Sequence, residues 1–253
     1  MSFDQAAKFY DRTRGYDPAS TAKAVAFLAD NIEKQKNVLD VGVGSGRFAA
    51  PLQRLGFTVA GVDVSREMLK VAAENVRILT LADARSLPFA SKAFGSTVSV
   101  HLFHLVANWE NILAEIMRVT QNNLLTVFDD IECRGVDPRE EYRRLAGGLR
   151  YPGLHESSLI PLAPPYRLKL VATEKRPADE LLQHLKDKRF SYQWKVPDPV
   201  HRKAIRNLNW MRGETLTCRV YACAWKVRSL ETFLEAMKKG FFRPANNERA
   251  EAQ

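Results

Sequence analysis

The sequence of 253 residues contains few cysteines and no long apolar run. Its three cysteines, Cys133, Cys218 and Cys223, form no C-x-x-C pair, so we expect small buried thiols and no metal site. No apolar segment approaches the ~18 residues that a membrane-spanning helix needs. The first residues also lack the basic and then apolar segments of a secretion signal. These absences predict a cytoplasmic protein without a membrane span.

Charge is unevenly distributed along the chain, which carries a formal net charge of +9. Residues 131–253 hold 24 Lys and Arg against 15 Asp and Glu, whereas residues 1–130 hold 14 of each. A basic half is typical either of an ordinary solvated surface or of a protein that binds nucleic acid or another acidic partner. The basic residues are dispersed rather than clustered, which favours the solvated surface and leaves nucleic acid as the alternative.

A glycine-rich stretch, Asn-Val-Leu-Asp-Val-Gly-Val-Gly-Ser-Gly over residues 37–46, dominates the sequence. A short apolar run containing Asp40 is followed by Gly42, Gly44 and Gly46, a pattern that predicts a strand, a nucleotide-binding turn and a helix. The third glycine comes one residue earlier than in the G-x-G-x-x-G fingerprint of dinucleotide sites. A pyrophosphate-binding loop is therefore disfavoured.

Two acidic residues follow the next two apolar runs. Asp63 ends the second predicted strand, 21 residues after Gly42, where a carboxylate can accept hydrogen bonds from both hydroxyls of a ribose. Asp83 follows the third run and precedes Ala84. Their order behind the glycine stretch predicts one site built at the ends of three neighbouring strands.

Together with the Glu-Ile-Met-Arg-Val segment at residues 115–119, these motifs resemble the class I S-adenosylmethionine (SAM)-dependent methyltransferases, in particular the type 11, ubiquinone/menaquinone-biosynthesis-like family. The resemblance covers roughly residues 3–130. It implies a Rossmann-like, doubly wound α/β fold with a seven-stranded, mostly parallel sheet of order 3-2-1-4-5-7-6. It also implies an N-terminal cap helix and an insertion after strand five.

The resemblance implies SAM as cofactor and S-adenosylhomocysteine as its product. The residues that it places at the cofactor are Asp40, Gly42, Gly44, Gly46, Asp63, Val64, Met68, Asp83, Ala84 and His101, with Tyr10, Arg14 and Tyr16 closing over it from the N-terminal cap. His101 follows strand four and His104 lies one turn further on, so both are candidates for a general base or a backbone-positioning residue. A structural role for His104 stays open.

One domain is expected over residues 1–253, with cap helices at 1–34, a SAM-binding half at 35–130 and a substrate-side half at 131–253. Apolar runs predict strands over residues 37–41, 57–62, 75–81, 96–100, 124–128, 167–173 and 219–227. Helical spacing predicts a first helix capped by Ser20 or Thr21 and another capped by Ser65. Residues 120–123, Thr-Gln-Asn-Asn, stand where the family has a glycine turn, and asparagine can adopt the same left-handed conformation.

Three functions fit these observations. The favoured one is methyl transfer from SAM to an oxygen, nitrogen or carbon nucleophile of a small molecule by in-line displacement. The alternatives are an RNA (tRNA) or protein methyltransferase that uses the basic half, and a SAM-binding protein without transferase activity. Aligning activated reactants can supply ~7–11 kcal/mol of the barrier reduction, so strong cofactor motifs with weak catalytic ones are what such chemistry predicts.

Overall fold

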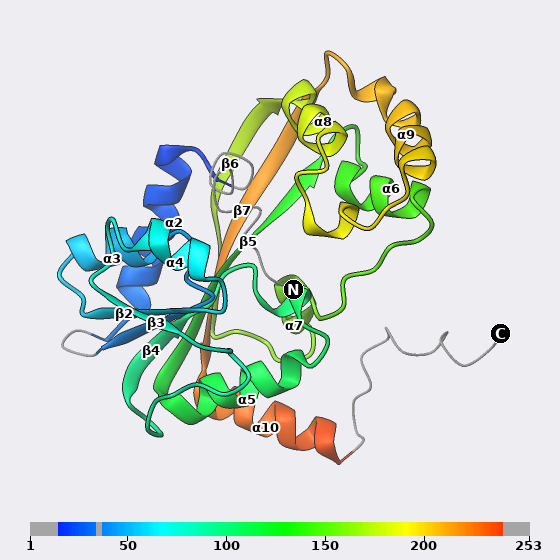
Figure 1. The fold of residues 1–253 in the computed structure, drawn as a ribbon. Coiled ribbons are helices and arrows are strands. Elements are labelled where there is room, and N and C mark those ends of the chain that lie inside the picture. The colour runs from blue at the N-terminus through cyan, green and yellow to red at the C-terminus, as the bar shows by residue number, and fades with distance from the viewer. Residues whose placement is uncertain (1–14, 34–36, 240–253) are drawn as a thin grey trace.

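The computed structural model describes residues 15–33 and 37–239, which form a seven-stranded sheet of order β3-β2-β1-β4-β5-β7-β6 (Figure 1). Strands β1 to β5 run parallel, and β7 lies antiparallel between β5 and β6. This topology confirms the predicted fold class. The strands are β1 (Val38–Val41), β2 (Val59–Asp63), β3 (Ile78–Leu81), β4 (Phe94–Val98), β5 (Thr120–Glu132), β6 (Arg167–Pro177) and β7 (Thr215–Lys226).

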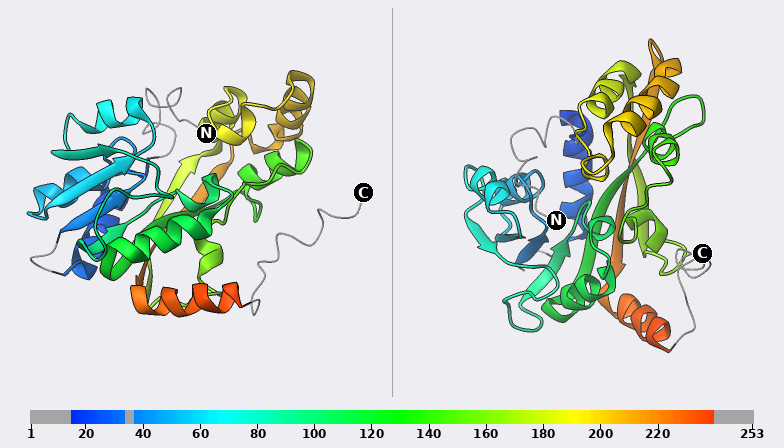
Figure 2. Two further views of the ribbon diagram at one scale, coloured as in Figure 1. Left: turned by 60° about the horizontal axis from the view of Figure 1, so that its bottom comes forward. Right: turned by 45° about the vertical axis from the view of Figure 1, so that its right-hand side comes forward.

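Helices cover both faces of the sheet, in agreement with β1, whose four residues are all buried. On one face, α2 (Pro18–Asn31) and α3 (Ala49–Arg54) pack over one apolar cluster; on the other, α5 (Trp109–Val119) and α10 (Val227–Lys238) pack over a second. Figure 2 shows α5 and α10 side by side. Helix α4 (Arg66–Ala72) and the 3-10 turn η1 (Phe103–Leu105) complete this body. The result is the three-layer arrangement expected of a doubly wound sheet.

The last three strands are much longer than β1 to β4. Pairing of β5 with β4 ends at Leu125, opposite Val98, but pairing of β5 with β7 continues to Glu132, opposite Thr217. These extensions carry a group of helices that we call the helical lobe: α6 (Pro138–Leu145), α8 (Ala178–Lys186), η2 (Ser191–Gln193), α9 (Asp198–Asn207) and η3 (Asn209–Met211) (Figure 1). The lobe encloses an apolar cluster of its own, and α7 (Glu156–Leu159) lies below it.

The structure corrects two local predictions. Residues 120–123 form no turn, because β5 begins at Thr120 and no residue of this stretch has a positive φ. The side chain of Asn123 is buried and donates a 2.8 Å hydrogen bond to the carbonyl of Asn31, so asparagine here ties the strand to α2. Helix α2 is capped by Asp17 instead of Ser20 or Thr21: its carboxylate accepts a 2.7 Å hydrogen bond from the Ser20 N–H, and Pro18 takes the first helical position.

Other expectations hold with shifted bounds. Ser65 caps α4 through a 3.2 Å bond from the Met68 N–H, as predicted. The three cysteines are buried. Strand β4 spans Phe94–Val98 instead of 96–100, so the chain has already left the sheet at His101. In the part of the chain that the structure describes, no helix is long and apolar enough to cross a membrane.

Candidate functional site

The glycine stretch forms a tight loop after β1. Gly42, Gly44 and Gly46 have φ values of +76°, +56° and +86°, a region that side-chain-bearing residues rarely adopt. A Cβ on Gly46 would lie 2.8 Å from a methyl of Val76, so this position requires glycine for packing. Among the residues that the structure describes, a Cβ on Gly44 would meet nothing nearer than the Gly42 carbonyl, at 3.9 Å, which leaves this face of Gly44 open to a ligand.

Asp63 ties this loop to the end of β2. Its carboxylate accepts hydrogen bonds from the backbone N–H of Gly44 at 2.9 Å and from that of Ser65 at 2.8 Å. These two bonds fix the orientation of the carboxylate at the end of β2. Asp40 is buried in β1; burial, followed by the charge of Asp63, raises the pKa of Asp40 to about 7.

The other predicted cofactor residues have different surroundings. Asp83 is engaged by Arg85, whose Nε and Nη2 lie 3.0 and 2.6 Å from its two oxygens, and this pairing lowers the pKa of Asp83. Val64 is exposed, Met68 is buried, and Ala84 packs half-buried against the core. Tyr10 and Arg14 lie outside the described residues.

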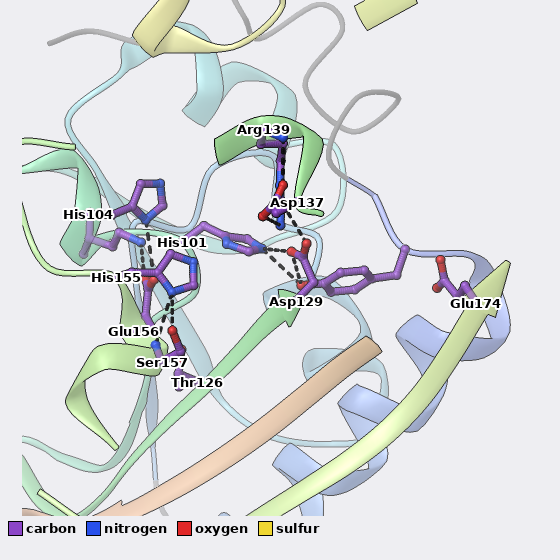
Figure 3. Close-up of polar contacts among 12 residues, drawn as sticks. His101, His104, Thr126, Asp129, Asp137, Arg139, His155, Glu156, Ser157 and Glu174 are labelled. Carbon is purple, nitrogen blue, oxygen red and sulfur yellow. Dashed lines mark hydrogen bonds and ion pairs between the residues drawn. The ribbon is translucent and has the colours of Figure 1, made fainter. Parts of the chain in front are cut away.

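His101 lies where the chain turns after β4, with a φ of +57°. Its Nε2 is 3.1 Å from the hydroxyl of Tyr16 and 3.6 Å from Oδ1 of Asp129, and the Tyr16 hydroxyl is 3.3 Å from the same oxygen. Figure 3 shows His101 directed at Asp129. Three segments far apart in the sequence therefore meet at one polar cluster.

Arg139 from α6 completes this cluster from the helical lobe. Its Nη1 donates a 2.8 Å bond to Oδ2 of Asp129, and its Nη2 lies 3.3 Å from Asp137, the N-cap of α6 (Figure 3). Burial alone would raise the pKa of Asp129, but Arg139 and His101 outweigh it and hold that pKa well below the usual range. Burial lowers the pKa of His101 to about 3. At neutral pH Asp129 is thus an anion and His101 a neutral imidazole.

His104 belongs to a second carboxylate pair, with Glu156 at the start of α7. Nδ1 of His104 is 3.4 Å from Oε2 of Glu156, while Oε1 accepts bonds from the N–H groups of Leu102 at 2.7 Å and Phe103 at 3.3 Å. Glu156 is therefore a cap for the η1 turn that carries His104. In Figure 3, His155 lies beside this pair.

A cavity of about 500 Å³ separates the two histidine pairs from the helical lobe. Its sheet side includes His101, His104 and Asp129, and its lobe side includes Arg143 and Tyr192. Aromatic contacts run along the wall, with ring centroids 5.4 Å apart for Phe128–Tyr221, 4.7 Å for His104–Tyr151 and 5.5 Å for Phe190–Tyr192. The cavity thus combines flat apolar surfaces with buried charges.

The glycine loop and the cavity meet at His101. The guanidinium of Arg47, directly after the loop, lies 5.0 Å from the ring centroid of Tyr16. A Cβ on Gly42 would lie 3.3 Å from a methyl of Leu102, the neighbour of His101. Tyr16 and His101 therefore stand between the loop and the cavity.

Sequence reasoning missed Asp129, Arg139 and Glu156. Asp129 follows the predicted fifth strand directly, just as Asp63 ends the second, and this parallel was the available signal. Arg139 and Glu156 lie in segments that carry no functional motif, so only the tertiary structure identifies them as part of the site. Within residues 15–33 and 37–239, no three His, Cys, Asp or Glu side chains gather in a way that could hold a metal ion.

Comparison with known proteins finds a family match for the part of the chain that carries the glycine stretch and Asp63. Residues 39–128 match a family described as a methyltransferase domain. The methyltransferase GfsG of Streptomyces halstedii is 36% identical over 107 residues, which is 39% of this chain and 38% of that protein. A phosphatidylethanolamine N-methyltransferase of Cereibacter sphaeroides is 31% identical over 47% of this chain and 64% of its own length. This chain thus spans less than two thirds of these relatives.

Solved structures share the fold over more of the chain. One from Bacillus halodurans C-125 covers 82% of this chain and 98% of its own, with a TM-score of 0.54 at 16% sequence identity. Phosphoethanolamine N-methyltransferase 2 of Haemonchus contortus, solved with phosphomonomethylethanolamine and S-adenosylhomocysteine, covers 88% of this chain and 57% of its own, with a TM-score of 0.51 at 17% identity. At such identities the likeness establishes the fold alone.

Proposed function

We propose that this chain, whose residues 39–128 match a family described as a methyltransferase domain, transfers a methyl group from SAM to a small molecule held in the cavity. The observation that carries this proposal is the meeting of the glycine loop and the cavity at Tyr16 and His101. A donor bound on one side would face an acceptor bound on the other.

The residues of the loop fit this cofactor. Gly44 leaves one face open to close approach, and Asp63 presents a carboxylate at the end of β2 that two backbone N–H groups orient, the position from which a ribose is recognised. Asp83 would accept from the adenine amino group, in competition with its present partner Arg85. Six further residues would surround the bound cofactor: Asp40, Gly42, Gly46, Val64, Met68 and Ala84.

Bound SAM supplies a methyl group already activated on a sulfonium. The chain's own work is then to bind the two molecules, align them and exclude water, because alignment lowers the barrier most in such a displacement. His101 and Tyr16 would hold the boundary between the two molecules. The partly buried ion pair of Asp129 and Arg139 would hold His101 and Tyr16 in position.

The acceptor site favours a small molecule over RNA. Its volume of about 500 Å³ falls within the roughly 300–1,000 Å³ of small-ligand sites. The exposed cations of α9, namely Arg202, Lys203 and Arg206, lie on a helix that contributes no residue to the cavity wall. The basic residues of this helix therefore stand apart from the place where methyl transfer would occur.

Calorimetry with SAM, followed by transfer assays with SAM carrying a labelled methyl group, tests the proposal. We expect micromolar or tighter binding and label in a small-molecule fraction of cell extract. Label in tRNA or protein instead would favour the corresponding alternative. Binding without label in any of these fractions would favour a non-catalytic SAM-binding protein, and absence of binding would reject the proposal.

A further inference from the structure

The cluster of Tyr16, His101 and Asp129 contains two hydrogen-bonding protons at neutral pH. Asp129 is an anion and can only accept, whereas the phenol of Tyr16 and the neutral ring of His101 each carry one proton. The three contacts of 3.1, 3.3 and 3.6 Å converge on two acceptor atoms, the phenol oxygen and Oδ1 of Asp129. The placement of the protons therefore decides which ring nitrogen of His101 remains a base.

One placement satisfies every group. If Tyr16 donates to Asp129, then Nε2–H of His101 donates to the phenol oxygen, and both shorter contacts become hydrogen bonds. If Tyr16 instead donates to His101, the carboxylate oxygen Oδ1 loses its donor in a buried place, which costs about 1–3 kcal/mol. The geometry thus favours the tautomer with the proton on Nε2. Nδ1 then carries a free lone pair.

Nδ1 of His101 is free to meet a ligand. Among the described residues it has no hydrogen-bond partner, and His101 lines the cavity. The charged and titratable groups that act on the ring are Tyr16, Arg47, His104, Asp129 and Glu156. Asp129 and Glu156 favour the protonated imidazole ring of His101, whereas Arg47 and His104 disfavour it. A positive charge that develops on the ring is therefore stabilised by Asp129 and Glu156.

We propose that Tyr16 and Asp129 hold His101 as a general base whose Nδ1 takes the proton of a hydroxyl acceptor in the cavity. This inference rests on the proposed methyl transfer. In the step, a lone pair of the acceptor oxygen forms the bond to the methyl carbon, and the carbon–sulfur bond breaks with its electron pair staying on sulfur. The hydroxyl proton passes to Nδ1, so the positive charge moves from the sulfonium to the imidazole ring.

A hydroxyl acceptor explains why such a base is present. A neutral amine can attack with its lone pair and keep its protons as a stable ammonium, so it needs no buried base. A hydroxyl oxygen becomes strongly acidic as it gains the methyl group, and a base of low pKa is then sufficient to take its proton. Asp129 serves as a positioning residue, because it acts through Tyr16 and stabilises the charged ring from a distance.

Nitrogen NMR of the histidine rings in the full-length protein tests the arrangement without any acceptor. We expect His101, identified by its loss in His101→Ala, to carry its proton on Nε2 at pH 7 and to remain neutral down to at least pH 5. Tyr16→Phe should keep the proton on Nε2, because Oδ1 of Asp129, at 3.6 Å, remains as an acceptor. Tyr16→Phe combined with Asp129→Leu removes both acceptors and should introduce the tautomer protonated on Nδ1. A wild-type ring protonated on Nδ1 would overturn the proposed relay.

Methyl transfer from SAM labelled with carbon-13 in its methyl group tests the acceptor class, since the product shift distinguishes O-, N- and C-methyl groups. Matched phenols, alcohols and amines form the panel, and we expect O-methyl products. Asp129→Asn should lower kcat by about 10²-fold or more while SAM affinity in calorimetry stays unchanged. Glu132→Gln, an acid-to-amide change on the same strand outside the cavity wall, should leave kcat unaltered.

The outcomes separate this inference from the function on which it rests. A wild-type protein that does not bind SAM would contradict the proposed function itself. Wild-type protein that binds SAM but methylates no hydroxyl compound, or methylates amines alone, would overturn the acceptor assignment. An Asp129→Asn variant as fast as Glu132→Gln would remove Asp129 from the reaction.

Discussion

The buried carboxylate of Glu156 accepts a 2.7 Å hydrogen bond from the backbone N–H of Leu102, a residue 54 positions earlier. Through this bond, the first residue of α7 fixes the turn that connects His101 to His104. The site therefore depends on a segment of the insertion after strand five, in which the sequence marks no functional residue. The bond also makes Glu156 a measurable contributor to stability.

Glu156→Ala should destabilise the protein at pH 7 by about 2 kcal/mol or more, because two buried N–H groups lose their acceptor. Glu156→Gln retains one acceptor oxygen and should cost less. Burial raises the pKa of Glu156, but His104 and His155 outweigh it and lower that pKa to about 2. This stabilisation is therefore present above about pH 4.5 and is lost as the pH falls toward 2. Urea unfolding at several pH values measures both effects, and equal losses in the two variants would contradict the capping role.

Asp63→Ala should weaken SAM binding at least tenfold in calorimetry, since the ribose would lose its acceptor and Gly44 its anchor. Glu67→Ala provides the control, because Glu67 is a nearby acidic residue whose recorded partner is Lys70 on the surface of α4. Unchanged affinity in Asp63→Ala would argue against the ribose assignment.

Alanine substitutions at Gly44 and Gly46 should have different effects, one mainly on SAM affinity and the other mainly on protein stability. Both residues have positive φ, which costs a side-chain-bearing residue about 1–2 kcal/mol. Gly44→Ala adds no clash and should reduce SAM affinity with little further loss of stability. Gly46→Ala must also displace Val76, so its melting temperature should fall further. Thermal unfolding and calorimetry on the two variants provide the comparison, and the reverse order of stability would refute this assignment of the loop.

Asp40→Asn should stabilise the protein at alkaline pH. Burial, followed by the charge of Asp63, raises the pKa of Asp40 to about 7, so the folded state keeps a proton that the unfolded state has already lost. Stability due to this group is full below about pH 4 and falls as the pH rises through 7. The variant should gain about 1–3 kcal/mol over the wild type at pH 8.5, given ~1.4 kcal/mol per pKa unit, and the difference should vanish near pH 4. Urea midpoints at the two pH values test this, and a gap independent of pH would contradict it.

The body of the fold follows from local patterns in the sequence. Apolar runs that alternate with helical segments dictate a parallel sheet, and the glycine stretch with Asp63 marks the end of the sheet where a ligand binds. The strands that the sequence predicts too short are β5, β6 and β7. Their extensions carry charged residues such as Asp129 and Glu174, which interrupt the apolar pattern. In the fold, Asp129 pairs with Arg139 of α6 and Glu174 pairs with Arg176 on its own strand.

The sequence by itself determined the glycine loop and the acidic residue that anchors it, because each follows directly on an apolar run, and its resemblance to a known family implied the sheet order. Only the tertiary structure showed which residues line the cavity proposed for the methyl acceptor. The contact of Tyr16 with His101 spans 85 positions, and the contact of Tyr16 with Asp129 spans 113. Each of these residues is an ordinary polar side chain in its own segment. Folding brings them together, where burial keeps His101 neutral and Arg139 keeps Asp129 charged against the effect of burial.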